Sequence, residues 1–397
     1  MPMKTIRRPS PVAIRAVDSP EIHPGSSLPS FEIRDPWSPL RRVEPIRKER
    51  AEPGVRVMVL SPHDGATVPW YVWRDLDADS RQRLQKSLIL ERDWGAESLA
   101  AELVAELNTD SFQKVELARA VLDLNRGWHV SSDGDGFLER PALLGDLGEH
   151  LLPETKQALF AAYANVDDTL QVEFASTNAA VSVHTMDQYG EDGALRPEVS
   201  IYFAQPAGSP GELLPDLRQN DTTGTAVRRH LHDAGFQVEI DKPYHLCPPH
   251  IEARMYRCLW YAFLFAELSS AAAEGKIPSG LPYRRVLRAL KDRHRGGERD
   301  SALLGWLLGN EGLHRLDECS WEELQQAYDH SRHYLQLSAE SLAASFQPPE
   351  ILAVDVRKDI LLPGCQRGER PDRNSIDRAR VTAVARAIAA ALRGARR

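Results

Sequence analysis

The chain has 397 residues, of which 42% are hydrophobic and 27% charged, and its formal net charge is −8 at pH 7. This is ordinary globular composition, and the negative charge argues against general nucleic-acid binding. The four cysteines include no Cys-x-x-Cys pair, which favours reduced thiols over a disulfide framework or a structural zinc knot. The chain shows no signal peptide and no apolar stretch of about 18 residues that would span a membrane, so we expect a cytoplasmic protein.

Residues 1–53 carry many prolines and charges with little periodicity, which is typical of an extended or partly disordered arm. We expect no chemistry in this proline-rich, charged N-terminal arm. The main domain is predicted to span residues 54–272. Residues 273–397 are predicted to form a C-terminal helical extension.

The main domain opens with a short apolar, β-branched run at residues 55–60, which predicts a strand that leads into a polar loop containing His63. Helices are expected at residues 80–91 and, with a clear amphipathic pattern, at 96–107. Residues 115–124 look like a buried strand that ends before Asn125 and Arg126.

The same design recurs at residues 179–183, an apolar strand predicted to end at His184. Further strands are expected at 198–203 and 236–240, with a helix at 225–234 stopped by Gly235. A long apolar helix at 251–268 would carry Glu252 in its first turn. Strands that alternate with helices predict an α/β fold, with a central sheet covered by helices on both faces.

The predicted C-terminal extension contains helical patterns at residues 283–291 and 321–337 and an alanine-rich helix at 376–392. The last helix has arginines on one side and small apolar residues on the other. Contact with a membrane surface is one interpretation. Packing on the chain's own domain is favoured, because the apolar face carries small residues rather than aromatic ones.

His63 and His184 are both predicted to follow strands. Neutral imidazole is a common protein ligand for zinc, and loops after strands can bring such residues together. The alternative for His63 is a turn histidine bonded to the backbone. Because two histidines share this placement, we interpret them as a metal-binding pair.

A catalytic zinc site usually has three protein ligands and one open position. Asp93 is the first candidate for the third ligand, since Asp64 adjoins His63 and would struggle to reach the same ion. Asp93 precedes a predicted helix, so the role of helix N-cap remains equally open.

Arg126 offers a guanidinium that can hold a substrate carboxylate through two parallel N–H bonds. Arg119 could assist or polarise an amide carbonyl. A salt bridge with Asp123 is the structural alternative for either arginine. The segment from His245 to His250 also has metal-ligand residue types, but its two prolines disfavour a site there.

These motifs resemble, in their order and spacing, the N-formylglutamate amidohydrolase family. The resemblance covers residues 55 to about 265 and is carried by Pro62-His63-Asp64-Gly65, Asp93-Trp94, the run from Arg119 to Arg126, His184-Thr185, Arg196-Pro197-Glu198-Val199, residues 220–225, and Ile251-Glu252 with Tyr256.

The resemblance implies a fold like that of zinc carboxypeptidases, with a mixed central sheet and one zinc ion. His63, Asp93 and His184 would be the metal ligands, and Glu252 the catalytic general acid and base. Asn125 and Arg126 would bind the substrate carboxylate, and Arg119 would assist catalysis.

The function expected from the resemblance is zinc-dependent cleavage of the C–N amide bond in an N-acyl amino acid, such as N-formylglutamate or a related acidic amide. Residues 243–249 replace the family's glycine-rich segment with a bulkier one, and Glu198 replaces its aspartate, so a larger amide or a peptide end is an alternative target. The rival functions are a metallopeptidase that trims a peptide C-terminus and a non-catalytic ligand-binding relative. The expected partner is a small molecule or peptide with a carboxylate.

Overall fold

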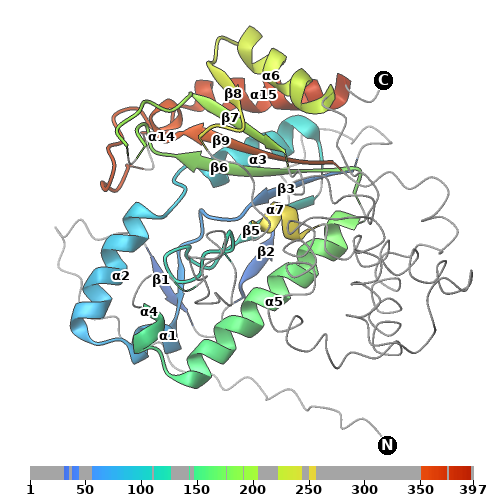
Figure 1. Cartoon of the computed structure of the whole chain (residues 1–397). Helices are drawn as coiled ribbons and strands as arrows, with labels where there is room; N and C mark the ends of the chain where they lie inside the picture. Colours follow the sequence, from blue (N-terminus) through green and yellow to red (C-terminus); the bar gives the residue numbers. More distant parts are fainter. Residues whose placement is uncertain are drawn as a thin grey trace, which may run out of the picture.

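The computed structural model describes residues 31–34, 38–43, 56–109, 111–126, 143, 147–175, 177–190, 192–203, 222–243, 250–255, 350–372 and 375–394. These residues form a mixed α/β fold in which helices flank a central sheet (Figure 1). The predicted fold class is therefore confirmed at this level. No helix within these ranges is long and apolar enough to cross a membrane.

The central sheet has seven strands in the order β2-β5-β3-β6-β9-β7-β8. Strands β5, β3, β6 and β9 are parallel to one another, β2 is antiparallel to β5, and β7 is antiparallel to β9. Strand β8 is parallel to β7. The strands are β2 (Leu40–Arg42), β3 (Val57–Ser61), β5 (Ser111–Val115), β6 (Ala179–Met186), β7 (Val199–Phe203), β8 (Val238–Ile240) and β9 (Glu350–Arg357). A separate parallel pair joins β1 (Glu32–Arg34) to β4 (Thr67–Pro69).

One face of the sheet packs against α3 (Ala96–Leu107), α6 (Thr222–Asp233) and α15 (Arg378–Gly394). Val181 and Val183 of β6 and Val354 of β9 belong to this buried core. Because side chains alternate across a strand, His184 of β6 and Asp355 of β9 point to the opposite face.

A second group of helices, which includes α2 (Ala78–Leu90) and α5 (Pro153–Ala175), lies on the side of the opposite face (Figure 1). The short helices α1 (Trp70–Asp75), α4 (Leu147–His150), α7 (Ile251–Arg254) and α14 (Lys358–Leu361) complete the described set. Polar side chains of β6 and β9 therefore lie in the interior, between the sheet and this second layer.

The expected strand at residues 115–124 is wrong in its position. The strand β5 covers Ser111–Val115, and the chain then turns, with the amides of Val121 and Leu122 both bonded to the carbonyl of Ala118. The apolar residues after the strand form a buried loop. A buried loop is as rich in apolar residues as a buried strand, so the two patterns look alike in the sequence.

The expected division at residue 272 is also wrong for the described part of the C-terminal region. Strand β9 lies between β6 and β7 in the middle of the sheet, and α15 covers the same sheet. The main domain therefore continues at least to Gly394. The helical patterns expected at 283–291 and 321–337, and residues 256–268 of the long helix, lie outside the described residues.

Part of the predicted N-terminal arm also belongs to the main domain. Strand β2 pairs with β5 at the sheet edge, and β1 pairs with β4. Residues 1–30 lie outside the described part of the chain. The boundary at residue 53 thus cuts through two strand pairings that join the arm to the main domain.

Other expected elements are confirmed. Helix α3 has the predicted bounds of 96–107, and α6 is followed by Gly235 with a left-handed φ of +89°. Helix α15 buries Val381, Val384 and Ile388 while Arg386 stays exposed, so its apolar face packs on the chain's own domain.

Candidate metal centre

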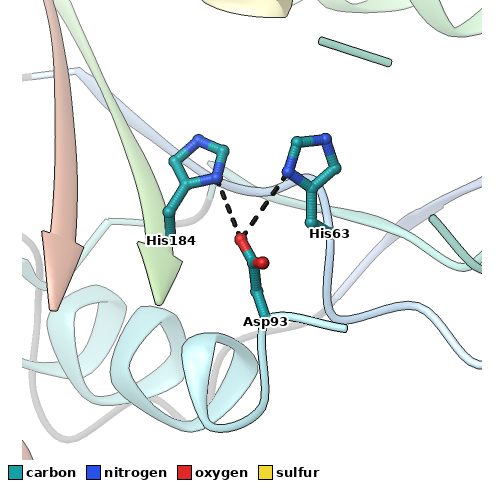
Figure 2. A group of neighbouring side chains, drawn as sticks. All are labelled: His63, Asp93 and His184. Atoms are coloured by element: carbon teal, nitrogen blue, oxygen red, sulfur yellow. Dashed lines mark hydrogen bonds and ion pairs between the residues drawn. The ribbon is translucent and has the colours of Figure 1, made fainter. Parts of the chain in front are cut away.

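Three side chains from different elements meet on the inner face of the sheet. His63 lies in the loop after β3, Asp93 in the loop between α2 and α3, and His184 in β6. One ligand atom from each lies within 4.8 Å of the other two, and all three residues are buried. Figure 2 shows the two imidazoles directed at the same carboxylate. The three predicted metal ligands are therefore brought together.

Both imidazoles approach the same oxygen of Asp93. His184 Nδ1 lies 3.1 Å from Asp93 Oδ2, and His63 Nδ1 lies 3.6 Å from it. Their outer nitrogens face other carboxylates, with His63 Nε2 3.4 Å from Asp123 Oδ1 and His184 Nε2 2.8 Å from Glu252 Oε1. A carboxylate behind an imidazole fixes which ring nitrogen carries the proton, and this arrangement is common around bound metals.

His184 lies within β6, which continues to Met186, rather than at the strand end that the sequence suggested. The side-chain alternation of the strand still directs it inward, and Ser182 precedes it on the same face. The Ser182 hydroxyl donates to Glu252 Oε1 at 2.6 Å. His184 is therefore held from a strand and braced by a second residue of that strand.

Asp93 is not the side-chain cap of α3. Its carboxylate faces the two imidazoles, whereas the first-turn amide of Glu97 donates to Asp64 Oδ2 at 2.9 Å. The N-cap position belongs to Gly95. The geometry therefore excludes the role of N-cap for Asp93. The side chain that accepts from the first turn of α3 is that of Asp64, which is distant in sequence.

The loop of His63 runs close to other backbone. A β-carbon added at Gly65 would lie 2.5 Å from the carbonyl oxygens of both Glu116 and Leu117. Only glycine permits this approach, which holds the His63 loop against the segment that leads to Arg119.

The protein charges around the imidazoles act on them differently. Burial, reinforced by the nearby Arg119 charge, lowers the pKa of His63. Burial also disfavours a charge on His184, but hydrogen bonds to Asp93 and Glu252 outweigh it and raise its pKa to about 10. Burial likewise opposes ionisation of Asp93, yet the hydrogen bond from His184 and the nearby His63 imidazole hold its pKa well below the usual range. The protein thus favours positive charge between Asp93 and Glu252.

These residues fit a divalent metal. Neither ring nitrogen of the buried His63 has a hydrogen-bond partner among the described residues, which is costly unless another ligand satisfies it. Two imidazoles and one carboxylate are the donor types that zinc takes in catalytic sites with an open position. A cation bound here would replace the proton that otherwise lies on His184.

Arg119 and Arg126 converge on Asp123. The Nε atoms of Arg119 and Arg126 lie 3.3 and 2.7 Å from Asp123 Oδ2, and Arg119 Nη1 lies 3.2 Å from Asp93 Oδ1. Burial opposes ionisation of Asp123, but the two arginines and His63 hold its pKa low. The salt bridges considered from the sequence therefore exist. Both arginine side chains nevertheless remain 18–23% exposed, so each also reaches the solvent side of the site.

The side chain of Asn125 holds the backbone at the beginning of α7. Its Oδ1 accepts a hydrogen bond from the amide of Ile251 at 3.2 Å, at the beginning of α7. The first turn of α7 is thereby fixed beside the loop of Asp123, and this places Glu252 against His184. The contact that the structure shows for the side chain of Asn125 therefore positions α7, and its predicted binding of substrate stays a prediction.

Glu252 is fully buried and is held by the two contacts to Oε1 described above. Burial opposes its ionisation, but the hydrogen bond and charge of His184 lower its pKa to about 2. A carboxylate that is ionised so strongly has little tendency to take up a proton near neutral pH.

Sequence reasoning missed Asp355 because it placed residues 350–357 in a helical region. Asp355 lies in β9, with its Cα paired with that of His184 in β6 and with that of Ser200 in β7. It is buried, its Oδ1 has no hydrogen-bond partner among the described residues, and burial raises its pKa to about 7. The apolar run of residues 351–356, half of it β-branched and interrupted only by Asp355, was the available sequence signal.

His250 is a second neighbour of the site. Burial lowers its pKa to about 4, although the charges of Glu252 and Asp123 oppose the effect. Its imidazole is therefore neutral. It was considered from the sequence as part of a separate metal site with His245, which lies outside the described residues. Among the described residues, the group that could hold a metal ion consists of His63, Asp93 and His184 and does not include His250.

No protein-family model and no curated protein matches this chain. Among solved structures, a gene product from Agrobacterium tumefaciens is 12% identical, with 86% of this chain and 90% of that chain covered at a TM-score of 0.42. An N-formylglutamate amidohydrolase from Ralstonia eutropha is 10% identical, with 91% and 98% covered at a TM-score of 0.39. The second bears the name of the family that the motifs resemble. At such low identities and TM-scores, function must be argued from the site.

Proposed function

We propose that this protein is a zinc-dependent hydrolase that cleaves the C–N amide bond of an N-acyl amino acid, such as N-formylglutamate or a related acidic amide. The observation that carries the proposal is the buried group of His63, Asp93 and His184, in which the nitrogens of His63 have no hydrogen-bond partner among the described residues. The motif resemblance is consistent with this chemistry. A zinc carboxypeptidase-like fold is part of the same proposal.

His63, Asp93 and His184 would hold one zinc ion. When bound, such an ion polarises an amide carbonyl and lowers the pKa of a water molecule to about 7. Asp123 and Glu252 would keep the outer nitrogens of the two imidazoles protonated, which leaves the Nδ1 atoms to face Asp93 and the ion.

Arg126 would bind the substrate carboxylate. Its Nε is fixed by Asp123 at 2.7 Å, so the remainder of the planar guanidinium is held in one orientation. A guanidinium can pair with a carboxylate through two parallel N–H bonds. Arg119, bonded to Asp93 and Asp123, would add positive charge beside the reacting carbonyl. The side-chain NH2 of Asn125 can donate a further hydrogen bond.

Glu252 was predicted to be the proton-transfer group, and Asp355 is proposed in its place because the pKa values of the two carboxyls differ. Both oxygens of Glu252 are buried, Oε1 is bonded to His184 and Ser182, and its pKa is lowered to about 2. Asp355 lies opposite His184 on the neighbouring strand, and its Oδ1, like Oε2 of Glu252, has no hydrogen-bond partner among the described residues. A pKa near the working pH suits a group that first accepts a proton from water and then donates it to the leaving amine.

The test is metal determination on the purified protein, followed by hydrolysis assays on a panel of N-acyl amino acids and on peptides with a free C-terminus. We expect about one zinc per chain and release of a carboxylic acid from an acidic N-acyl substrate. Release of terminal residues from peptides would indicate the metallopeptidase instead. Zinc binding without turnover of any member of the panel would favour a ligand-binding relative.

The matched variants are His63→Ala and His232→Ala. Removing one of three ligands should abolish stoichiometric zinc and lower kcat/KM by at least about 100-fold, because the ion and the chemistry it supplies are lost. His232 is an exposed histidine of α6, with 80% of its side chain accessible, and its removal should change neither quantity. A His63→Ala protein with full zinc content and full activity contradicts the proposal.

A further inference from the structure

A buried ion pair lies directly beside the metal-binding group and has no part in the proposed chemistry. Arg92 Nε lies 2.6 Å from Asp64 Oδ1, and the two side chains are only 6% and 5% exposed. Asp64 follows His63, and Arg92 precedes Asp93. The pair therefore joins the two loops that carry two of the three metal-binding side chains.

Each partner makes a second contact that orders its surroundings. Asp64 Oδ2 accepts the amide of Glu97 in the first turn of α3 at 2.9 Å. The guanidinium of Arg92 lies 4.2 Å from the centre of the Trp94 ring, the arrangement of a cation–π contact. The residues on both sides of Asp93 are thus held in place.

Two hydrogen bonds to backbone carbonyls extend this network to all three proposed ligands. The amide of Asp93 donates to the carbonyl of His63 at 3.1 Å. The hydroxyl of Thr185, next to His184 in β6, donates to the carbonyl of Trp94 at 3.2 Å. Every metal-binding residue therefore has a sequence neighbour tied to the loop at residues 92–94.

We propose that Asp64 and Arg92 are positioning residues that set the relative placement of His63, Asp93 and His184, and with it the affinity of the site for zinc. The proposal rests on the metal centre proposed above. A buried carboxylate and guanidinium resist separation, because either charge left alone would be poorly solvated. The ion pair therefore restricts the two loops to one arrangement, and less freedom is lost when the metal binds.

The test compares the zinc affinity of the wild type with that of Asp64→Asn. In the variant, the side-chain NH2 must face either Arg92 or the amide of Glu97, both of which are donors, so one of the two bonds is lost. Removal of a supporting contact of this kind typically weakens metal binding about 10–100-fold. We expect a loss of this size in the zinc Kd, measured on metal-free protein by competition with a chromophoric chelator.

The control is Asp75→Asn. Asp75 is a buried carboxylate that accepts hydrogen bonds from Arg74, Thr155 and the amide of Leu152, between the end of α1 and the start of α5. Its substitution should destabilise the fold without changing the zinc Kd or the visible absorption of the Co²⁺-loaded protein. The Co²⁺ spectrum of Asp64→Asn should differ from that of the wild type, because the ligands are placed differently.

A zinc Kd within twofold of the wild type in Asp64→Asn overturns the positioning role. If that variant does not fold, the zinc Kd of Arg92→Lys is compared with that of the wild type in the same way. This variant keeps the positive charge but loses the planar guanidinium. Equal weakening by Asp75→Asn would also overturn the inference, by showing that general destabilisation suffices. A wild type that binds no zinc refutes the proposed metal centre itself, so the two failures are distinct.

Discussion

The two imidazoles at the centre of the site differ in their surroundings although they share a carboxylate. Burial and the nearby charge of Arg119 favour the neutral form of His63 and outweigh the opposing effect of Asp93 and Asp123. His184 lies between Asp93 and Glu252, which favours its charged form. A metal ligand must be neutral at the coordinating nitrogen, so zinc binding should release a proton chiefly from His184.

Substitution of the two candidate proton-transfer residues separates their roles. We expect Asp355→Asn to lower kcat about 100- to 10,000-fold while zinc content is kept, because a general base is lost and the ligands are not. Glu252→Gln should weaken zinc binding more than it lowers the kcat of the zinc-saturated enzyme, because it weakens the support of His184. Steady-state kinetics at saturating zinc, together with zinc Kd values, measure both effects.

The pH dependence of the wild type belongs to the same experiment. A general base acts when it is deprotonated, so kcat/KM should rise as the pH increases through about 7, the value to which burial raises the pKa of Asp355. If Asp355→Asn keeps full kcat and only Glu252→Gln loses kcat, Glu252 is the general base.

Helix α15 shows how an element far along the chain supports the site. It packs against α3 and α6 on the face of the sheet opposite His184, and its buried residues include Val384 and Ile388. Helix α3 begins just after Asp93, so α15 indirectly supports the loop that carries this ligand.

Truncation of one buried side chain tests this packing. Ile388→Ala should lower the free energy of unfolding by about 2–5 kcal/mol, since the site is fully buried and a cavity remains. Arg386→Ala, on the exposed side of the same helix, should change it by no more than about 0.5 kcal/mol. Chemical denaturation of both variants gives the comparison, and equal small effects would mean that α15 does not belong to the core.

At the scale of the whole molecule, strand order decides which parts can fold alone. Strand β9 pairs with β6 along all eight of its residues and with β7 on its other side, although the chain separates β8 from β9 by more than a hundred residues. The centre of the sheet is therefore completed only by the C-terminal part of the chain.

A fragment that ends at residue 272 should accordingly fail to form a stable domain. Without β9, the facing edges of β6 and β7 lack their hydrogen-bond partner, and without α15 one face of the sheet is exposed. We expect the fragment to aggregate or to lack a cooperative thermal transition, while a fragment supplying residues 273–397 restores solubility on co-expression. A soluble 1–272 fragment that unfolds cooperatively and binds zinc would contradict this expectation.

The sequence singled out the three side chains that lie together, because short polar motifs after apolar runs are visible without a structure. His63, Asp93 and His184 were predicted as the ligand set and lie together. The amphipathic helix at 96–107 was likewise predicted with its observed bounds, since local periodicity determines a helix almost alone.

The tertiary structure decided everything that depends on neighbours distant in sequence. It placed Asp93 against the imidazoles rather than on the helix end, and it put Asp355 beside His184 by inserting β9 into the sheet. Strand pairing and the solvation of buried charges arise from contacts between segments distant in sequence, so no local pattern contains them. The sequence by itself thus determined which residue types gather at the site. The fold determined that Asp93 lies against an imidazole, that Glu252 is bonded to His184 and that Asp355 lies on the neighbouring strand.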